Sequence, residues 1–205
     1  MYNGYLNVLK TLANAHIDDS MVNIHHEAQA LARYYVKERD RIVNEFRKFK
    51  AEDERWRVFE PLTLVVSRTE KATACDMEGS KTLMGVRIVW TLYYRNRRTK
   101  KRGSNTVPKG TGAMYERNKL LALAKECTKN LVEEVEYAAA ILRLQSQYLM
   151  ECRRKINGCV NRMYKFKDRL HAKAEADQFQ IPRIEDVVRD QPEIAHLVFE
   201  KAYWE

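Results

Sequence analysis

Basic side chains gather in one short segment of this 205-residue chain. Between Arg95 and Lys119 there are nine basic residues and a single acid, Glu116. This local excess nearly equals the net charge of +9 of the whole chain. A surplus concentrated in this way is typical of a surface that binds the phosphates of nucleic acid or an acidic partner. The segment therefore holds the first candidate binding residues.

The residues around this segment alternate with the period of two that is expected for β-strands. One strand is predicted to begin after Pro61, and 84–97 is the clearest strand in the chain, with the polar stretch 69–82 as the loop between them. The residues 99–103 predict a hairpin turn, and a short return strand at 104–107 ends at Pro108.

One face of the main strand is apolar, and the other alternates arginines with an aromatic ring. An antiparallel ribbon with such a face fits the major groove of duplex DNA, where Arg contacts guanine edges and phosphates. The alternative is that these arginines form only the solvated face of a sheet. The candidate DNA-binding residues are Arg87, Tyr93, Arg95, Arg97, Arg98, Lys100, Lys101, Arg102, Lys109 and Lys119.

A glycine-rich turn follows, with Lys109, Gly110, Thr111 and Gly112 in succession. Backbone amides of such a turn, with a helix behind them, can bind a phosphate. The spacing of a nucleotide-binding P-loop is missing. The other interpretation is that the glycines only let a strand turn into a helix.

Enzyme signatures are missing from the sequence. The adjacent His25 and His26 lack the spacing of a metal site, and no second histidine completes a zinc-protease motif after His26. Four cysteines without metal-ligand spacing indicate free thiols in a reducing cytoplasm, with Cys152 and Cys159 expected on a buried helix face. We therefore expect no catalytic residues, metal or cofactor. The sequence also lacks a membrane span and a secretory signal, so we expect a cytoplasmic protein without a membrane partner.

Two heptad patterns must position the predicted sheet. The longer alternates steps of four and three through Ala124, Thr128, Leu131, Val135, Ala138, Leu142, Gln145, Leu149, Cys152, Ile156, Cys159, Met163, Phe166 and Leu170. The shorter runs through Met21, Ile24, Ala28, Leu31, Tyr35, Ile42 and Phe49, with Ser20 as the predicted N-cap. Gly158 could bend or interrupt the longer helix, because glycine disfavours a helix interior.

These patterns predict an α+β fold that is mostly helical. Two long helices form an antiparallel coiled-coil-like hairpin, with a small antiparallel β-sheet inserted between them. Residues 1–175 are expected to be one domain, with helices at 3–16 and 20–54, the sheet at 58–108 and a long helix at 113–175. Short helices in 176–205 form a C-terminal appendage. The longer heptad helix could instead pair with its copy in a homodimer.

The order of these motifs resembles that of the MobI family of conjugative-transfer proteins. The resemblance rests on a helix containing Glu27 to Ala32, a strand from Met84 to Trp90, the glycine-rich segment from Lys109 to Tyr115, and a helix containing Leu131 to Glu136. It covers roughly residues 25–165 and departs at both ends and in the loop 69–82. It implies an accessory protein that acts at the origin of transfer beside a relaxase, without nicking activity of its own.

The leading hypothesis is thus a DNA-binding accessory protein in which a basic β-hairpin contacts duplex DNA. Two alternatives stay open. The heptad helices could make the chain a coiled-coil adaptor for other proteins, with the charge attracting an acidic partner. The same basic surface could bind RNA or a single strand, since phosphate contacts alone do not discriminate between nucleic acids.

Overall fold

The computed structural model describes residues 2–50, 59–72, 81–95 and 102–177. Two long helices, α1 (Tyr2–Lys48) and α3 (Lys129–Ala176), account for most of these residues. Between them in the sequence lie three strands, β1 (Leu62–Ala72), β2 (Lys81–Arg95) and β3 (Arg102–Thr106). A short helix α2 (Arg117–Leu123) and a 3-10 turn η2 (Glu126–Thr128) precede α3. The mostly helical α+β class is confirmed.

The strands form one antiparallel sheet in the order β1-β2-β3. In the register, Leu64 lies opposite Trp90 and Tyr93 lies opposite Ser104. The first strand begins directly after Pro61, as predicted, but it continues through Ala72, and β2 starts at Lys81. The predicted loop 69–82 is therefore partly wrong: its ends belong to the strands, and 73–80 lies outside the described residues.

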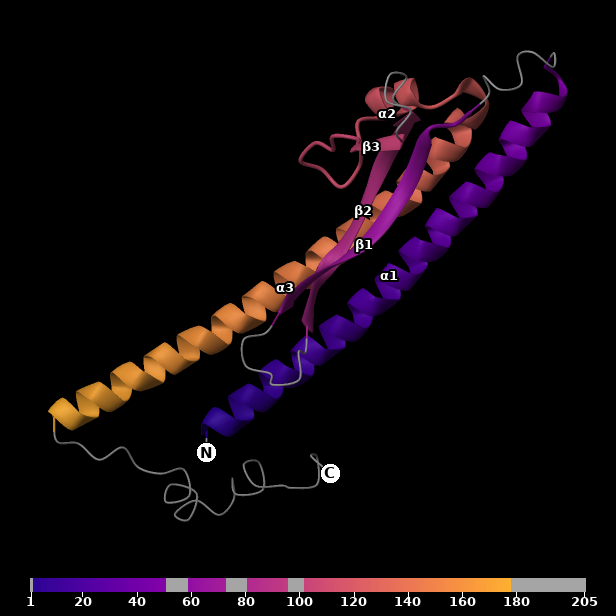
Figure 1. Cartoon of the computed structure of the whole chain (residues 1–205). Coiled ribbons are helices and arrows are strands. Elements are labelled where there is room, and N and C mark those ends of the chain that lie inside the picture. Colours follow the sequence, from indigo (N-terminus) through magenta and orange to yellow (C-terminus); the bar gives the residue numbers. More distant parts are fainter. Residues whose placement is uncertain (1, 51–58, 73–80, 96–101, 178–205) are drawn as a thin grey trace. The chain divides into compact units, whose positions relative to one another are not determined.

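The chain divides into two compact units, residues 1–156 and 157–205. In the first unit the core forms where both helices meet the apolar face of the sheet (Figure 1). Trp90 lies edge-on against Tyr35 of α1, with ring centroids 5.0 Å apart, and its indole contacts α3. The heptad residues of α1 are buried at Met21, Ala28 and Tyr35, as predicted. At Trp90, α1 and α3 both pack against the sheet and not only against each other. The antiparallel coiled-coil hairpin therefore stays a prediction.

The N-terminal helix corrects three sequence expectations. A single helix runs through the predicted segment 3–16 and most of the predicted segment 20–54, and it ends at Lys48. Ser20 lies inside it, where its hydroxyl donates a hydrogen bond to the carbonyl of His16, 2.9 Å away, so it is not an N-cap. Phe49, expected on the apolar seam, lies beyond the helix end and is exposed.

The predicted long helix 113–175 is broken near its start. Ala124 and Lys125 have extended backbone between α2 and η2, and α3 begins only at Lys129. The buried carboxylate of Glu60 explains this break, because it accepts hydrogen bonds from the Lys125 N–H and the Thr128 hydroxyl. These bonds take the place of the intrahelical ones that a continuous helix would make. Further along, α3 continues through Gly158 without interruption.

The buried face of α3 differs from the predicted seam at every second position. Leu131, Val135 and Leu142 are buried as expected. At the seam positions between these, the buried residues are instead Ala139, Ser146 and Arg153, each one residue after a predicted seam residue. Cys152 and Cys159 are exposed, which corrects the expectation that both thiols are buried. Of the described helices, none has the length and apolar character needed to cross a membrane.

Candidate nucleic-acid interface

One face of the sheet is left open by the helices. Side chains of successive strand residues point to opposite faces, so the register places Ser67, Arg87, Tyr93 and Ser104 together. All four are exposed. The opposite face carries the buried core residues such as Trp90. The fold therefore presents the polar and basic face of the sheet to its surroundings, as the alternation predicted.

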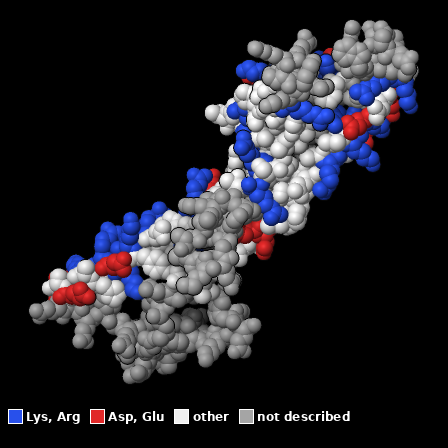
Figure 2. All heavy atoms as spheres, viewed as in Figure 1, with Lys and Arg blue, Asp and Glu red and all other residues white. Residues whose placement is uncertain are grey.

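The sheet is strongly basic in composition. Its three strands contain six Lys or Arg residues and one acidic residue, Glu70. Figure 2 shows Lys and Arg side chains around a largely uncharged surface over the strands, with few acidic side chains among them. A surface of this kind attracts polyanions over a distance set by ionic strength.

The structure brings several predicted binding residues together. Arg87 and Arg102 are exposed, and Tyr93 is 43% exposed. The backbone of Arg95 lies opposite Arg102 in the β2–β3 register, and Arg102 is on the same face as Tyr93. Arg102 and Gly103 belong to the return strand, which was predicted to begin at 104. The hairpin turn with Arg97, Arg98, Lys100 and Lys101 lies outside the described residues.

Lys109 and Lys119 follow the strands in the sequence, and each is engaged by a local partner. The Lys109 ammonium donates a hydrogen bond to the Gly112 carbonyl. Burial is the main cause that lowers the pKa of Lys109, and the positive charge of Arg143 nearby lowers it further. Lys119 forms an ion pair with Glu116 at 2.6 Å, but it stays largely exposed. The predicted helix N-terminus directly behind the glycine-rich turn is wrong, because α2 begins only at Arg117.

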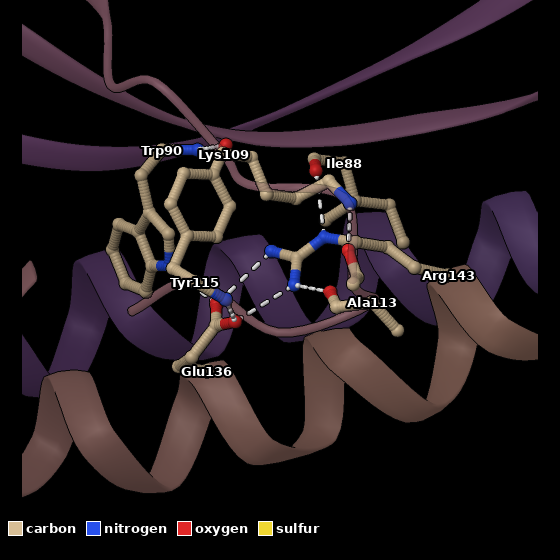
Figure 3. Close-up of polar contacts among 8 residues, drawn as sticks. Ile88, Trp90, Lys109, Ala113, Tyr115, Glu136 and Arg143 are labelled. Atoms are coloured by element: carbon tan, nitrogen blue, oxygen red, sulfur yellow. Dashed lines mark hydrogen bonds and ion pairs between the residues drawn. The ribbon is translucent and has the colours of Figure 1, made fainter. Parts of the chain in front are cut away.

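A buried polar cluster attaches this sheet to α3 (Figure 3). Arg143 and Glu136 form a bidentate ion pair, with Nη1–Oε1 and Nη2–Oε2 distances of 2.9 and 3.0 Å. Each oxygen of Glu136 accepts a second bond, from the indole N–H of Trp90 at 2.7 Å and from the backbone N–H of Tyr115 at 2.8 Å. Both oxygens of the buried carboxylate therefore accept two hydrogen bonds each, which offsets the cost of burying its charge.

The same cluster reaches the backbone of β2. The guanidinium of Arg143 donates to the carbonyl of Ile88 at 2.8 Å, and Ser146 accepts from the N–H of Val86 at 3.2 Å. The Tyr115 hydroxyl accepts from the N–H of Trp90 at 3.3 Å, and burial raises the pKa of that hydroxyl. Because β3 pairs only with residues 91–95, these side chains bind the part of β2 that β3 does not cover.

The short hairpin is fixed by a close contact across its strands. Gly103 lies opposite Tyr94, and a Cβ on Gly103 would fall 2.7 Å from Cζ of the tyrosine ring. A larger side chain at position 103 would require the exposed end of the Tyr94 ring to move aside. This packing of an aromatic ring on a cross-strand glycine stabilises the register that places Tyr93 and Arg102 on the open face.

The sequence analysis missed some residues of the open sheet face and the buried Glu136–Arg143 pair that attaches the sheet to α3. Ser67, Ser104 and Thr106 are exposed on the open face, and the strand alternation was the signal that could have identified them. Glu136 and Arg143 were also missed. Their separation of seven residues places them on one helix face, and the buried Trp90 needed a hydrogen-bond acceptor.

Comparison with known proteins identifies a family. No curated protein and no solved structure gives a match to the chain. The family model described as MobI protein matches residues 24–157, which include the sheet, the basic segment and the buried cluster that supports them. This match covers well over half of the chain and agrees with the motif order seen in the sequence. The chain therefore belongs to the MobI family.

Proposed function

We propose that this mobilisation-related protein is a non-catalytic accessory factor that binds DNA at the origin of transfer and assists a relaxase. The observation that supports this best is the open sheet face, on which Arg87, Tyr93 and Arg102 are exposed together. Guanidinium groups on a two-stranded ribbon can reach base edges in the major groove, while the adjoining turn contacts phosphates.

Each residue group has a distinct role in this proposal. The basic turn, with Arg97, Arg98, Lys100 and Lys101, supplies sequence-independent affinity through phosphate contacts. Arg87 and Arg102 lie on the strands and are candidates for base contacts. The Glu136–Arg143 pair does not touch DNA, but it holds β2 on α3 so that this face stays presented.

A charge-matched pair of variants tests the interface. In the first, Arg97, Arg98, Lys100, Lys101 and Arg102 are replaced by Ala. In the control, five exposed bases of α3 are replaced instead: Lys155, Arg162, Lys165, Arg169 and Lys173. Both variants lose five positive charges, so a difference between them reports on position. Binding to a duplex carrying the origin of transfer, and to a scrambled duplex, is followed by fluorescence anisotropy at several salt concentrations.

We expect the hairpin variant to lose most of its duplex affinity and the control to keep it. The slope of log K against log salt should fall by about 0.9 for each phosphate contact removed. Tighter binding to the origin duplex than to the scrambled one would support recognition of the origin. Equal affinity of the hairpin and control variants would refute the interface.

Single-stranded nucleic acid is a second candidate ligand, favoured by the exposed ring of Tyr93 between strand arginines. Aromatic rings on a sheet face stack on unpaired bases, and each stacked base contributes about 1–3 kcal/mol. Tyr93→Ala should therefore weaken single-strand binding by about ten-fold or more while it leaves duplex binding nearly unchanged. Equal effects on both ligands would argue against stacking.

A further inference from the structure

The two outer edges of the sheet differ in how they are covered. On the part of β2 that β3 does not reach, side chains from outside the sheet bind the backbone at Val86, Ile88 and Trp90. The opposite edge belongs to β1, which pairs with β2 alone among the described strands. An uncovered strand edge can accept a further strand, so proteins usually protect it.

The register shows which backbone groups form the free edge of β1. The N–H of Val86 and the C=O of Ile88 point away from β1, because they bind side chains of α3. Opposed residues of an antiparallel pair direct their backbone groups either toward each other or away from each other. Arg68 and Val66, the partners of Val86 and Ile88, therefore turn their own N–H and C=O groups outward. Among the described residues none binds these outward groups, and Val66 is partly and Arg68 largely exposed.

An apolar groove of about 350 Å³ lies between β1 and α1, which runs alongside this strand (Figure 1). Ala32 and Val36 of α1 line the groove with Leu64 of β1. Arg33 and Lys37 complete the lining. Both bases are exposed, and neither forms an ion pair with another described residue. The free edge is thus accompanied by an apolar depression and two available positive charges.

We propose that the free edge of β1 binds an extended, acidic segment of another protein as a fourth strand of the sheet. The N–H and C=O groups of Val66 and Arg68 form the backbone hydrogen bonds of this addition. Alternate side chains of the segment point toward α1. An apolar one enters the groove, and acidic ones on either side of it reach Arg33 and Lys37.

The chemistry of the edge favours such a segment over two other ligands. Nucleic acid has no peptide groups with which to continue a β-sheet, and its phosphates gain nothing from Ala32 and Val36. A second copy of this chain would present the same basic edge, so that pairing through β1 would bring like charges together. The site lies on the edge of the sheet and not on its open face, so it does not depend on the proposed binding of DNA.

Amide hydrogen exchange of the full chain, followed by NMR, tests the strand addition. The probe is a capped heptapeptide of the order Thr-Glu-Thr-Val-Thr-Glu-Thr, in which Val and both Glu share one face of a strand. In the free chain the amides of Val66 and Arg68 should exchange quickly. Those of Val65 and Ser67, which face β2, should exchange slowly. With a Kd of about 0.1 mM, peptide at about 1 mM should slow exchange at Val66 and Arg68 about ten-fold. Unchanged exchange at these two amides would overturn the proposal.

Two substitutions of Val66 separate backbone pairing from side-chain packing. Val66→Pro and Val66→Ala both remove the valine side chain, but only proline also removes the outward N–H, which β2 does not use. In fluorescence anisotropy, Val66→Pro should bind the labelled peptide about ten-fold more weakly than Val66→Ala, while both keep the wild-type circular dichroism spectrum. Equal binding by the two variants would refute the addition of a strand.

Charge reversal tests the acidic character of the partner without altering β1. Arg33→Glu with Lys37→Glu should weaken binding of the peptide about ten-fold and should favour a peptide with Lys in place of both Glu. The matched control reverses Arg169 and Lys173, exposed bases of α3 with the same spacing, and should bind as the wild type does. Unchanged affinity in the groove variant, or an equal loss in the control, would contradict the proposal. Protection of Val66 that grows with protein concentration alone would instead assign the edge to a second copy, and protection by a DNA duplex would assign it to nucleic acid.

Discussion

Replacing Glu136 by Gln should destabilise the first unit strongly, although it changes a single atom. The carboxylate accepts four hydrogen bonds, from Trp90, Tyr115 and two nitrogens of Arg143. A glutamine has one acceptor oxygen, so its NH₂ group must face a buried N–H donor. The buried guanidinium also loses its counter-charge. Loss of one partner of a buried ion pair costs about 3–5 kcal/mol, which is a large part of the 5–15 kcal/mol that stabilises a typical domain.

Urea unfolding of the full chain, followed by circular dichroism, measures this free energy. Glu27→Gln is the matched control, because the same chemical change there affects an exposed helical side chain and should alter the free energy of unfolding by less than about 0.5 kcal/mol. A cycle with Arg143→Met should show coupling of about 1–3 kcal/mol between the two sites. A free energy of unfolding for Glu136→Gln within about 1 kcal/mol of wild type would refute the reasoning.

Three further changes test other parts of the fold. Gly103→Val should cost no more than about 1 kcal/mol in urea unfolding, because the exposed end of the Tyr94 ring can move aside, and Tyr94→Ala in the same chain should remove that cost. Glu60→Ala leaves the donors of Leu62, Lys125 and Thr128 without their acceptor and should cost about 3 kcal/mol or more; a smaller effect would mean that water replaces the carboxylate. Burial, with Arg68 and His26 nearby, lowers the pKa of His25 below 6.5, so the unfolded chain takes up the proton first as the pH falls. Stability should therefore decrease from about pH 7 downwards until the folded pKa is reached, and His25→Gln should flatten that part of the curve.

The sheet was the part of the fold that the sequence predicted best. Alternating apolar and polar residues identified β2, and Pro61 marked the start of β1, because strand periodicity depends on nearby residues alone. The open face followed from the same alternation. The binding role of its residues stays a prediction, since neither the fold nor the family match tests a contact with DNA.

The helical interface was predicted less well, for a physical reason. The heptad spacing placed Gln145 and Cys152 on the buried seam, yet the buried residues are their neighbours Ser146 and Arg153. They are buried because they bind partners far away in the sequence: Ser146 binds the backbone of β2, and Arg153 binds Asp18 of α1. The break at Lys125 has the same cause, because Glu60, which holds it open, lies 65 residues earlier. A local pattern does not contain such long-range partners.

The side chains of α3 and of Tyr115 that bind the backbone of β2 also affect the behaviour of the chain at high concentration. A strand edge with unpaired N–H and C=O groups is a template on which another chain can add a strand and begin to aggregate. Here Ser146, Arg143 and the Tyr115 hydroxyl bind three backbone groups of β2: the N–H of Val86, the C=O of Ile88 and the N–H of Trp90. A mutation that separates α3 from the sheet would expose these backbone groups, so we expect α3 also to protect the sheet against edge-to-edge association.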